Sequence, residues 1–216
     1  MASLVRVQHP TTIIVSGPTG SGKTFFVVRL INSSLIQPPP ERMWWLYSYW
    51  QSVYEELGKD VKFVHARGPE SAAAVTRILG EMKPEERNLL VLDDQMGSLG
   101  DSTELASLFT EGSHHLNLTV IYLVQNLFNK GKSQITVSRN THYFILFKNP
   151  RDTSQVSCLM QQLAKGKVQS MVKIFEDATG QPFSYLYIDC HPNYDKDLRY
   201  CTNIFPGEEF YSYEAL

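Results

Sequence analysis

A glycine-rich segment between a strand pattern and a helix pattern is the feature that most restricts the fold of this chain. The apolar run 12–15 leads into Gly-Pro-Thr-Gly-Ser-Gly-Lys-Thr, and a helix pattern continues from Phe25. The G-x-x-x-x-G-K-T spacing predicts a phosphate-binding loop, because glycines let backbone N–H groups surround a polyphosphate at a helix start. The alternative is a strand-to-helix turn without a ligand. The residues predicted to bind nucleotide are Gly17, Pro18, Thr19, Gly20, Ser21, Gly22, Lys23 and Thr24.

Two carboxylates at the end of a later apolar run complete the predicted magnesium site. In such loops the lysine, here Lys23, reaches the β- and γ-phosphates, and the hydroxyl of the last residue, here Thr24, binds Mg²⁺. The segment 88–94 reads N-L-L-V-L-D-D, which is the Walker B form. Asp93 is expected to hold the Mg²⁺ shell directly or through water, and Asp94 to polarise an attacking water. The alternative is an ordinary loop with two acidic residues, and the short Asp94 stands where most related enzymes have Glu.

A polar residue ends the next predicted strand. The run 118–124 is followed by Gln125 and Asn126. An amide at the tip of a strand beside the Walker B strand can contact both the γ-phosphate and the attacking water, which predicts a sensor role for Gln125. The alternative is a simple strand cap, because Asn and Gln are frequent there.

Short apolar runs alternate with helical stretches along the chain. Near-continuous apolar strands such as 89–92 and 120–124 indicate burial on both faces, which is typical of a parallel sheet between helix layers. We therefore expect a three-layer α/β fold with its active site at the carboxyl ends of the strands. The predicted strands are 11–16, 43–47, 62–65, 88–92, 118–124, 142–147 and 184–189, and the predicted helices are 22–35, 70–82, 103–114 and 153–165.

Size and composition fit one globular domain. The chain has 216 residues, and it lacks both a long apolar run typical of a membrane span and the pattern of a signal peptide. Its three cysteines, Cys158, Cys190 and Cys201, are too irregularly spaced for a disulfide framework or a zinc site, which indicates a reducing compartment. We therefore expect a protein that is not secreted.

Charge is distributed unevenly. The segment 129–173 has eight basic residues against one acidic residue, net +7, whereas the rest of the chain is net −9. A basic segment is a candidate contact for the phosphates of nucleotide or nucleic acid, and the alternative is a set of solvated charges scattered over several elements. The basic residues are Lys130, Lys132, Arg139, Lys148, Arg151, Lys165, Lys167 and Lys173.

Aromatic residues are concentrated in two places. The first is the segment 43–54, where we expect core or interface packing in preference to base stacking. The second is the acidic C-terminal segment 174–216, whose aromatic side chains are expected to dock on a surface. From the loop 17–24 and the run 88–94 we expect a P-loop ATPase core at 1–173. The segment 174–216 is expected to be a C-terminal extension that packs on this core.

Four segments together resemble a known family. They are G-P-T-G-S-G-K-T, L-V-L-D-D, L-F-T-E-G-S-H-H-L-N-L-T-V-I-Y-L-V-Q-N-L-F at 108–128, and H-Y-F-I-L-F-K-N-P-R-D at 142–152. The set is similar to the genome-packaging ATPases of Polinton/Maverick elements, virophages and other viruses with double-jelly-roll capsids, within the FtsK/HerA superfamily. The resemblance runs from about Thr11 to Pro206. The P-loop is shared by a vast class, and the segment from Phe109 to Asp152 is what narrows the family.

The resemblance implies further properties. They are an additional-strand P-loop core, ATP and Mg²⁺ as ligands, a homo-oligomeric ring of five or six subunits, and double-stranded DNA driven through its centre into a capsid. Such rings supply an arginine to the neighbouring subunit's γ-phosphate, for which Arg139 and Arg151 are the candidates. Lys130 and Lys132 beside Gly131 are candidate DNA contacts in the pore, and a capsid or portal-vertex protein is a candidate partner. The resemblance also implies a protein of the host cytoplasm or nucleus, or one associated with a virion.

The resulting prediction is an ATP-hydrolysing DNA translocase that packages a viral or transposon-like genome. Lys23, Asp93, Asp94, Gln125 and an arginine would carry its chemistry. Another FtsK/HerA-like motor, acting in segregation, recombination or DNA unwinding, is the first alternative. A small-molecule kinase and a nucleotide-dependent assembly module without turnover are the other two.

Overall fold

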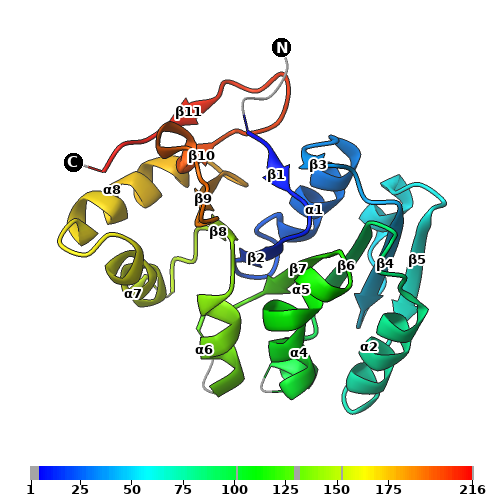
Figure 1. The fold of residues 1–216 in the computed structure, drawn as a ribbon. Coiled ribbons are helices and arrows are strands. Elements are labelled where there is room, and N and C mark those ends of the chain that lie inside the picture. The colour runs from blue at the N-terminus through cyan, green and yellow to red at the C-terminus, as the bar shows by residue number, and fades with distance from the viewer. Residues whose placement is uncertain (1–4, 101, 129–131, 152, 216) are drawn as a thin grey trace.

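The computed structural model describes residues 5–100, 102–128, 132–151 and 153–215 (Figure 1). Its main feature is a nine-stranded sheet with the order β11-β10-β9-β8-β2-β7-β6-β4-β5. The strands of this sheet are β2 (Thr12–Ser16), β4 (Arg42–Tyr47), β5 (Val61–His65), β6 (Asn88–Asp93), β7 (Leu118–Val124), β8 (Tyr143–Phe147), β9 (Tyr185–Asp189), β10 (Tyr200–Thr202) and β11 (Tyr211–Ser212). A small parallel pair, β1 (Val7–Gln8) and β3 (Ile36–Gln37), stands apart.

Strand direction brings the predicted site residues to one edge of the sheet. The strands from β8 to β5 are all parallel, whereas β9, β10 and β11 extend the sheet in antiparallel fashion. Strand β7 lies between β2, which precedes the glycine-rich loop, and β6, which ends at Asp93. The predicted α/β fold with a mainly parallel sheet is confirmed.

Helices cover both faces of the sheet (Figure 1). Helix α1 (Lys23–Asn32) and the 3₁₀ turn η1 (Ser52–Glu56) pack on one face. The elements with core residues on the other face are α2 (Glu70–Glu81), α3 (Met96–Leu99), α4 (Thr103–Ser107), the π-helical turn η2 (Leu108–Gly112), α6 (Lys132–Arg139), α7 (Ser154–Leu163) and α8 (Val168–Ala178). The short α5 (Ser113–His115) and η3 (Lys196–Leu198) complete the set. No helix in the described ranges is long and apolar enough to cross a membrane.

Alternation along β6 explains the three layers. Leu89 and Val91 point to the α1 side, whereas Leu90 and Leu92 point to the opposite helices, and all four are fully buried. Successive side chains of a strand lie on opposite faces, so a continuous apolar run needs cover on both. Burial on both faces, as predicted from the run 89–92, is confirmed.

Three described helices, α3, α6 and α8, were not expected from the sequence, and α1 ends earlier than expected. Helix α1 stops at Asn32 and not at Leu35, because Ser34 adopts a left-handed conformation (φ 56°) and the chain then pairs with β1. Helix α6 is short and polar, so its apolar period is weak. Helix α8 has a clear signal that the prediction missed, since Met171, Ile174 and Phe175 are buried at helical spacing.

The aromatic segment 43–54 mainly packs in the core. Trp44, Trp45 and Tyr54 are each at most 1 % exposed, which confirms the packing interpretation for these three rings. Tyr49 and Trp50 are exposed, in the loop between β4 and η1.

The C-terminal segment belongs to the same sheet. Strands β9, β10 and β11 extend it beyond β8, and the ring of Phe205 lies 5.2 Å from that of Phe26 on α1. The Tyr213 hydroxyl donates a hydrogen bond of 2.8 Å to Asp177. The predicted boundary between residues 173 and 174 falls inside α8, so the division of the chain there stays a prediction.

Candidate nucleotide-binding site

The loop 17–24 joins the central strand β2 to α1 and needs glycine at three positions. Gly20 and Gly22 have positive φ values of 78° and 101°, which L side chains rarely adopt. A Cβ on Gly17 would lie 2.7 Å from Cβ of Phe147. The Gly17 N–H donates to the carbonyl of Val124 at 3.1 Å, which ties the loop to the end of β7. The glycines therefore fix a tight curve of backbone against the carboxyl edge of the sheet.

Lys23 lies inside this curve. Its Nζ donates to the carbonyl oxygens of Gly17 at 2.7 Å and Pro18 at 2.9 Å. Burial lowers the pKa of Lys23, and the negative charges of Asp93 and Asp94 partly oppose that shift. In the same loop the hydroxyl of Ser21 is buried and has no hydrogen-bond partner among the described residues. A phosphate ligand would fit here, because it could accept hydrogen bonds from both the Lys23 ammonium group and the Ser21 hydroxyl.

Three donors converge on one oxygen of Asp93. The Tyr54 hydroxyl lies 2.8 Å from Oδ2, the Thr24 hydroxyl 3.3 Å and the Gln51 amide nitrogen 3.4 Å. Asp93 is only 4 % exposed. Its burial raises the pKa of the carboxyl, whereas the hydrogen bond from Tyr54 and the charge of Lys23 lower it. The fold thus brings Asp93 beside Lys23 and Thr24, which lie far earlier in the sequence.

Tyr54 is a member of this site that the sequence interpretation missed, since it was assigned to packing alone. Its ring lies 4.9 Å from Trp45, 5.2 Å from Trp50 and 5.6 Å from Phe63. Burial, followed by the charge of Asp93, raises the pKa of Tyr54, so its hydroxyl remains a donor. Nothing in the sequence pattern distinguishes this tyrosine from its aromatic neighbours, because the contact depends on how η1 packs against β6.

Asp94 and Gln125 lie on the same edge of the sheet. Asp94 is exposed and has a φ of 55°, and its carbonyl accepts a hydrogen bond of 2.9 Å from the Ser48 hydroxyl. Gln125 is exposed directly after β7, between the loop 17–24 and the end of β6. Their predicted roles in orienting water and sensing phosphate stay predictions.

The two candidate arginines lie at opposite edges. Arg151 is exposed after the carboxyl end of β8, at the edge of the sheet that also carries the loop 17–24. Arg139 is exposed at the end of α6, before β8 begins, and thus near the other edge. The basic segment therefore does not form one patch. Lys130 and Gly131 lie outside the described residues, and Lys132 is the first residue of α6.

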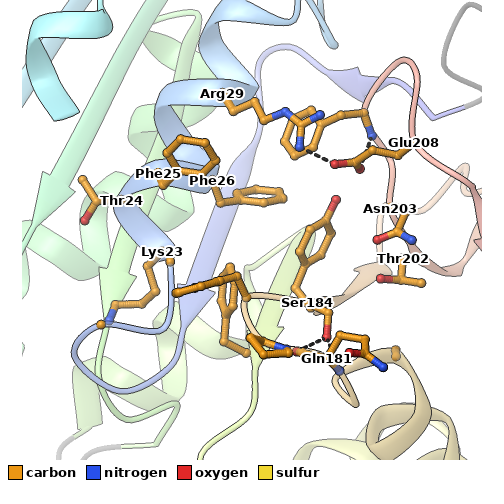
Figure 2. Close-up of a pocket in the computed structure, with 18 of the residues that line it drawn as sticks. Lys23, Thr24, Phe25, Phe26, Arg29, Gln181, Ser184, Thr202, Asn203 and Glu208 are labelled. Atoms are coloured by element: carbon orange, nitrogen blue, oxygen red, sulfur yellow. Dashed lines mark hydrogen bonds and ion pairs between the residues drawn. The ribbon is translucent and has the colours of Figure 1, made fainter.

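The donor set fits Mg²⁺. The Thr24 hydroxyl and the Asp93 carboxylate meet at 3.3 Å beside the loop 17–24. Oxygen ligands are what Mg²⁺ prefers, and it usually keeps waters and binds through one or two carboxylates together with substrate phosphates. Lys23 and Thr24 also line a cavity of about 1050 Å³ that extends along α1 (Figure 2).

Comparison with known proteins identifies the fold. No protein-family model and no curated protein matches the chain. Similar solved structures include the genome packaging NTPase B204 from Sulfolobus turreted icosahedral virus 2 in complex with AMP, with a TM-score of 0.59, 10% identity, and coverage of 84% of this chain and 94% of that chain. The complex of that NTPase with ATP-gammaS gives a TM-score of 0.61, 11% identity and coverage of 86% and 95%. A further structure is that of B204, the DNA-packaging ATPase from Sulfolobus Turreted Icosahedral Virus. It has a TM-score of 0.61 and 10% identity, and the match covers 86% of this chain and 95% of that chain. At these identities the similarity shows the fold alone, and that fold is the P-loop NTPase fold.

Proposed function

We propose that this chain is a Mg²⁺-dependent ATPase that drives double-stranded DNA into a capsid. The observation that carries the proposal is the convergence of Lys23, Thr24 and Asp93 at the carboxyl edge of the sheet. The fold it shares with a viral genome-packaging NTPase supports the same function. The resemblance of the sequence to the Polinton/Maverick and virophage branch narrows the proposal to that group of packaging ATPases.

The residues of this edge divide the chemistry of hydrolysis among them. Lys23 stabilises the charge that develops on the γ-phosphate, and Asp94 orients the attacking water. When bound between Thr24 and Asp93, Mg²⁺ supplies electrostatic neutralisation of the phosphates. Gln125 lies on the strand between the two motifs, so it can contact both the γ-phosphate and the water.

A ring would complete this site with an arginine from the next subunit. Arg151 is the better candidate on position, because it is exposed at the same edge as the loop 17–24. Arg139 lies near the opposite edge of the sheet, so it is the better candidate for a contact away from the nucleotide. Mixing wild-type protein with an Arg151→Ala variant tests the assignment: in a ring, the variant should lower the ATPase rate of wild-type neighbours, and Arg139→Ala should not.

The decisive experiment is the ATPase rate with and without double-stranded DNA, over a range of protein and salt concentrations. A shared active site makes the rate per subunit rise with protein concentration. Contact with the DNA backbone makes its stimulation sequence-independent and weaker at high salt. A slow rate that is independent of concentration and indifferent to DNA would contradict the proposal and favour a monomeric phosphotransferase. Binding of ATP without turnover would favour an assembly module.

A further inference from the structure

The large cavity beside Lys23 extends well beyond the space that phosphates and Mg²⁺ require. It has a volume of about 1050 Å³, which is at the upper end of what small-molecule sites have. Side chains of α1 line one side of it, and Thr202, Asn203 and Glu208 line the other (Figure 2). The C-terminal segment, for which the sequence indicates only docking, therefore forms a wall of this cavity.

Phe183 is an exposed ring at the mouth of the phosphate loop. Its side chain is 71% exposed, although it is apolar, and its backbone has a φ of 65°. A Cβ on Gly22 would lie 3.4 Å from Cδ1 of Phe183, so the ring stands directly beside the loop. Ser184 closes the turn by accepting from the Gln181 N–H at 3.2 Å and donating to the Gln181 carbonyl at 2.7 Å. Backbone strain of this kind is typical of ligand sites, and an exposed ring beside the loop offers a flat face on which a base can stack.

Thr202 supplies an unsatisfied polar group in the same cavity. It is 4 % exposed, and its hydroxyl has no hydrogen-bond partner among the described residues. A buried hydroxyl without a partner carries a desolvation penalty, which a ligand atom would remove.

The charged groups of the cavity wall away from Lys23 are mostly paired. Arg29 forms an ion pair with Glu208, and Asp177 accepts a hydrogen bond from Tyr213. Among the described residues, this part of the cavity therefore offers no free cation for a further phosphate. Its chemistry suits a neutral, planar and polar group.

We infer that this cavity binds the nucleoside of the triphosphate, with the base stacked on Phe183 and a polar atom of the nucleoside bonded to the Thr202 hydroxyl. The inference rests on the proposed function, because the phosphates must be held by the loop 17–24. Under this inference, the C-terminal segment 174–216 recognises the base through Phe183 and Thr202.

The test compares binding of ATP with binding of tripolyphosphate, which has the phosphates and lacks the nucleoside. Phe183→Ala removes the ring without relaxing the turn, because alanine and phenylalanine are similarly strained at this φ. It should weaken ATP binding at least fivefold, which is the lower end of base–aromatic stacking. Thr202→Val keeps the shape and removes the hydroxyl, and it should weaken ATP binding about fivefold. Tripolyphosphate should bind both variants as it binds wild type.

Two further measurements keep the result interpretable. Thr202→Val should not lower the melting temperature, because the hydroxyl has no bond to lose within the described structure, and a purely structural threonine would behave differently. Ile135→Ala is the control, because Ile135 is also an exposed apolar side chain but lies on α6. It should change the binding of neither ATP nor tripolyphosphate. Normal ATP binding by both cavity variants, or equal weakening of ATP and tripolyphosphate, would overturn the inference. If wild type binds neither ligand, the proposed function itself fails, which is a distinct result.

Discussion

Replacing Tyr54 by phenylalanine removes one hydroxyl beneath the predicted magnesium site and leaves the ring in its aromatic surroundings. The hydroxyl donates at 2.8 Å to Asp93, whose carboxylate is 4 % exposed. Hydrogen bonds to charged groups contribute about 1.5–3 kcal/mol. The two remaining donors, from Thr24 and Gln51, are longer at 3.3 and 3.4 Å, so they replace only part of that bond. We therefore expect the free energy of unfolding to fall by about 2 kcal/mol.

The effect on Mg²⁺ should exceed what lost stability explains. Partners that orient a metal-binding carboxylate typically change metal affinity by about 10–100-fold when removed. Because two donors to Asp93 remain, we expect the Mg²⁺ concentration for half-maximal binding of an ATP analogue to rise about tenfold. Titrating Mg²⁺ against a fluorescent ATP analogue measures this shift, and urea denaturation measures the stability.

Tyr187→Phe is the matched control. Tyr187 is 1 % exposed, and its hydroxyl has no hydrogen-bond partner among the described residues. Removing that hydroxyl should change the unfolding free energy by less than about 0.5 kcal/mol and leave the Mg²⁺ response unchanged. If Tyr54→Phe behaves like this control, the hydroxyl does not hold Asp93 and the reasoning is refuted.

Three other changes have expected outcomes. Lys23→Ala should abolish ATP hydrolysis with little change in melting temperature, because among the described residues the Lys23 ammonium group donates only to loop carbonyls. Unimpaired turnover in the purified variant would contradict the assignment of Lys23 to the nucleotide site. Asp94→Asn should bind ATP normally and hydrolyse it orders of magnitude more slowly, since Asn tolerates the φ of 55°, and single-turnover assays check this. Burial, followed by the charge of His191, lowers the pKa of His142 to about 4, so stability is lost as the pH falls from 6.5 to 4. In urea denaturation, the His142→Gln variant should lose less stability over that pH range than wild type. If stability falls equally with pH in both proteins, His142 is not the group responsible.

The local patterns of the chain predicted the central part of the fold well. The run 118–124 agrees with β7 to the residue, and the runs before Gly17 and Asp94 agree with β2 and β6 within one residue. The middle of each of these strands is a continuous apolar run, and such a run predicts burial on both faces. Errors fall where tertiary contacts override local preference, as at Ser34, or where the apolar period is short, as in α6.

The sequence by itself determined the glycine-rich loop 17–24, the strand that ends in Asp93 and the class of fold, because each depends on neighbours within a few residues. Only the tertiary structure decided which distant groups meet. Tyr54 contacts Asp93 across 39 positions of sequence, and Thr24 contacts it across 69. The parallel order that sets β7 between β2 and β6 brings Thr24 near Asp93, and the packing of η1 brings Tyr54 to the same carboxylate. A periodic pattern specifies which face of an element is buried, but the partner on that face is fixed by the packing of the whole sheet.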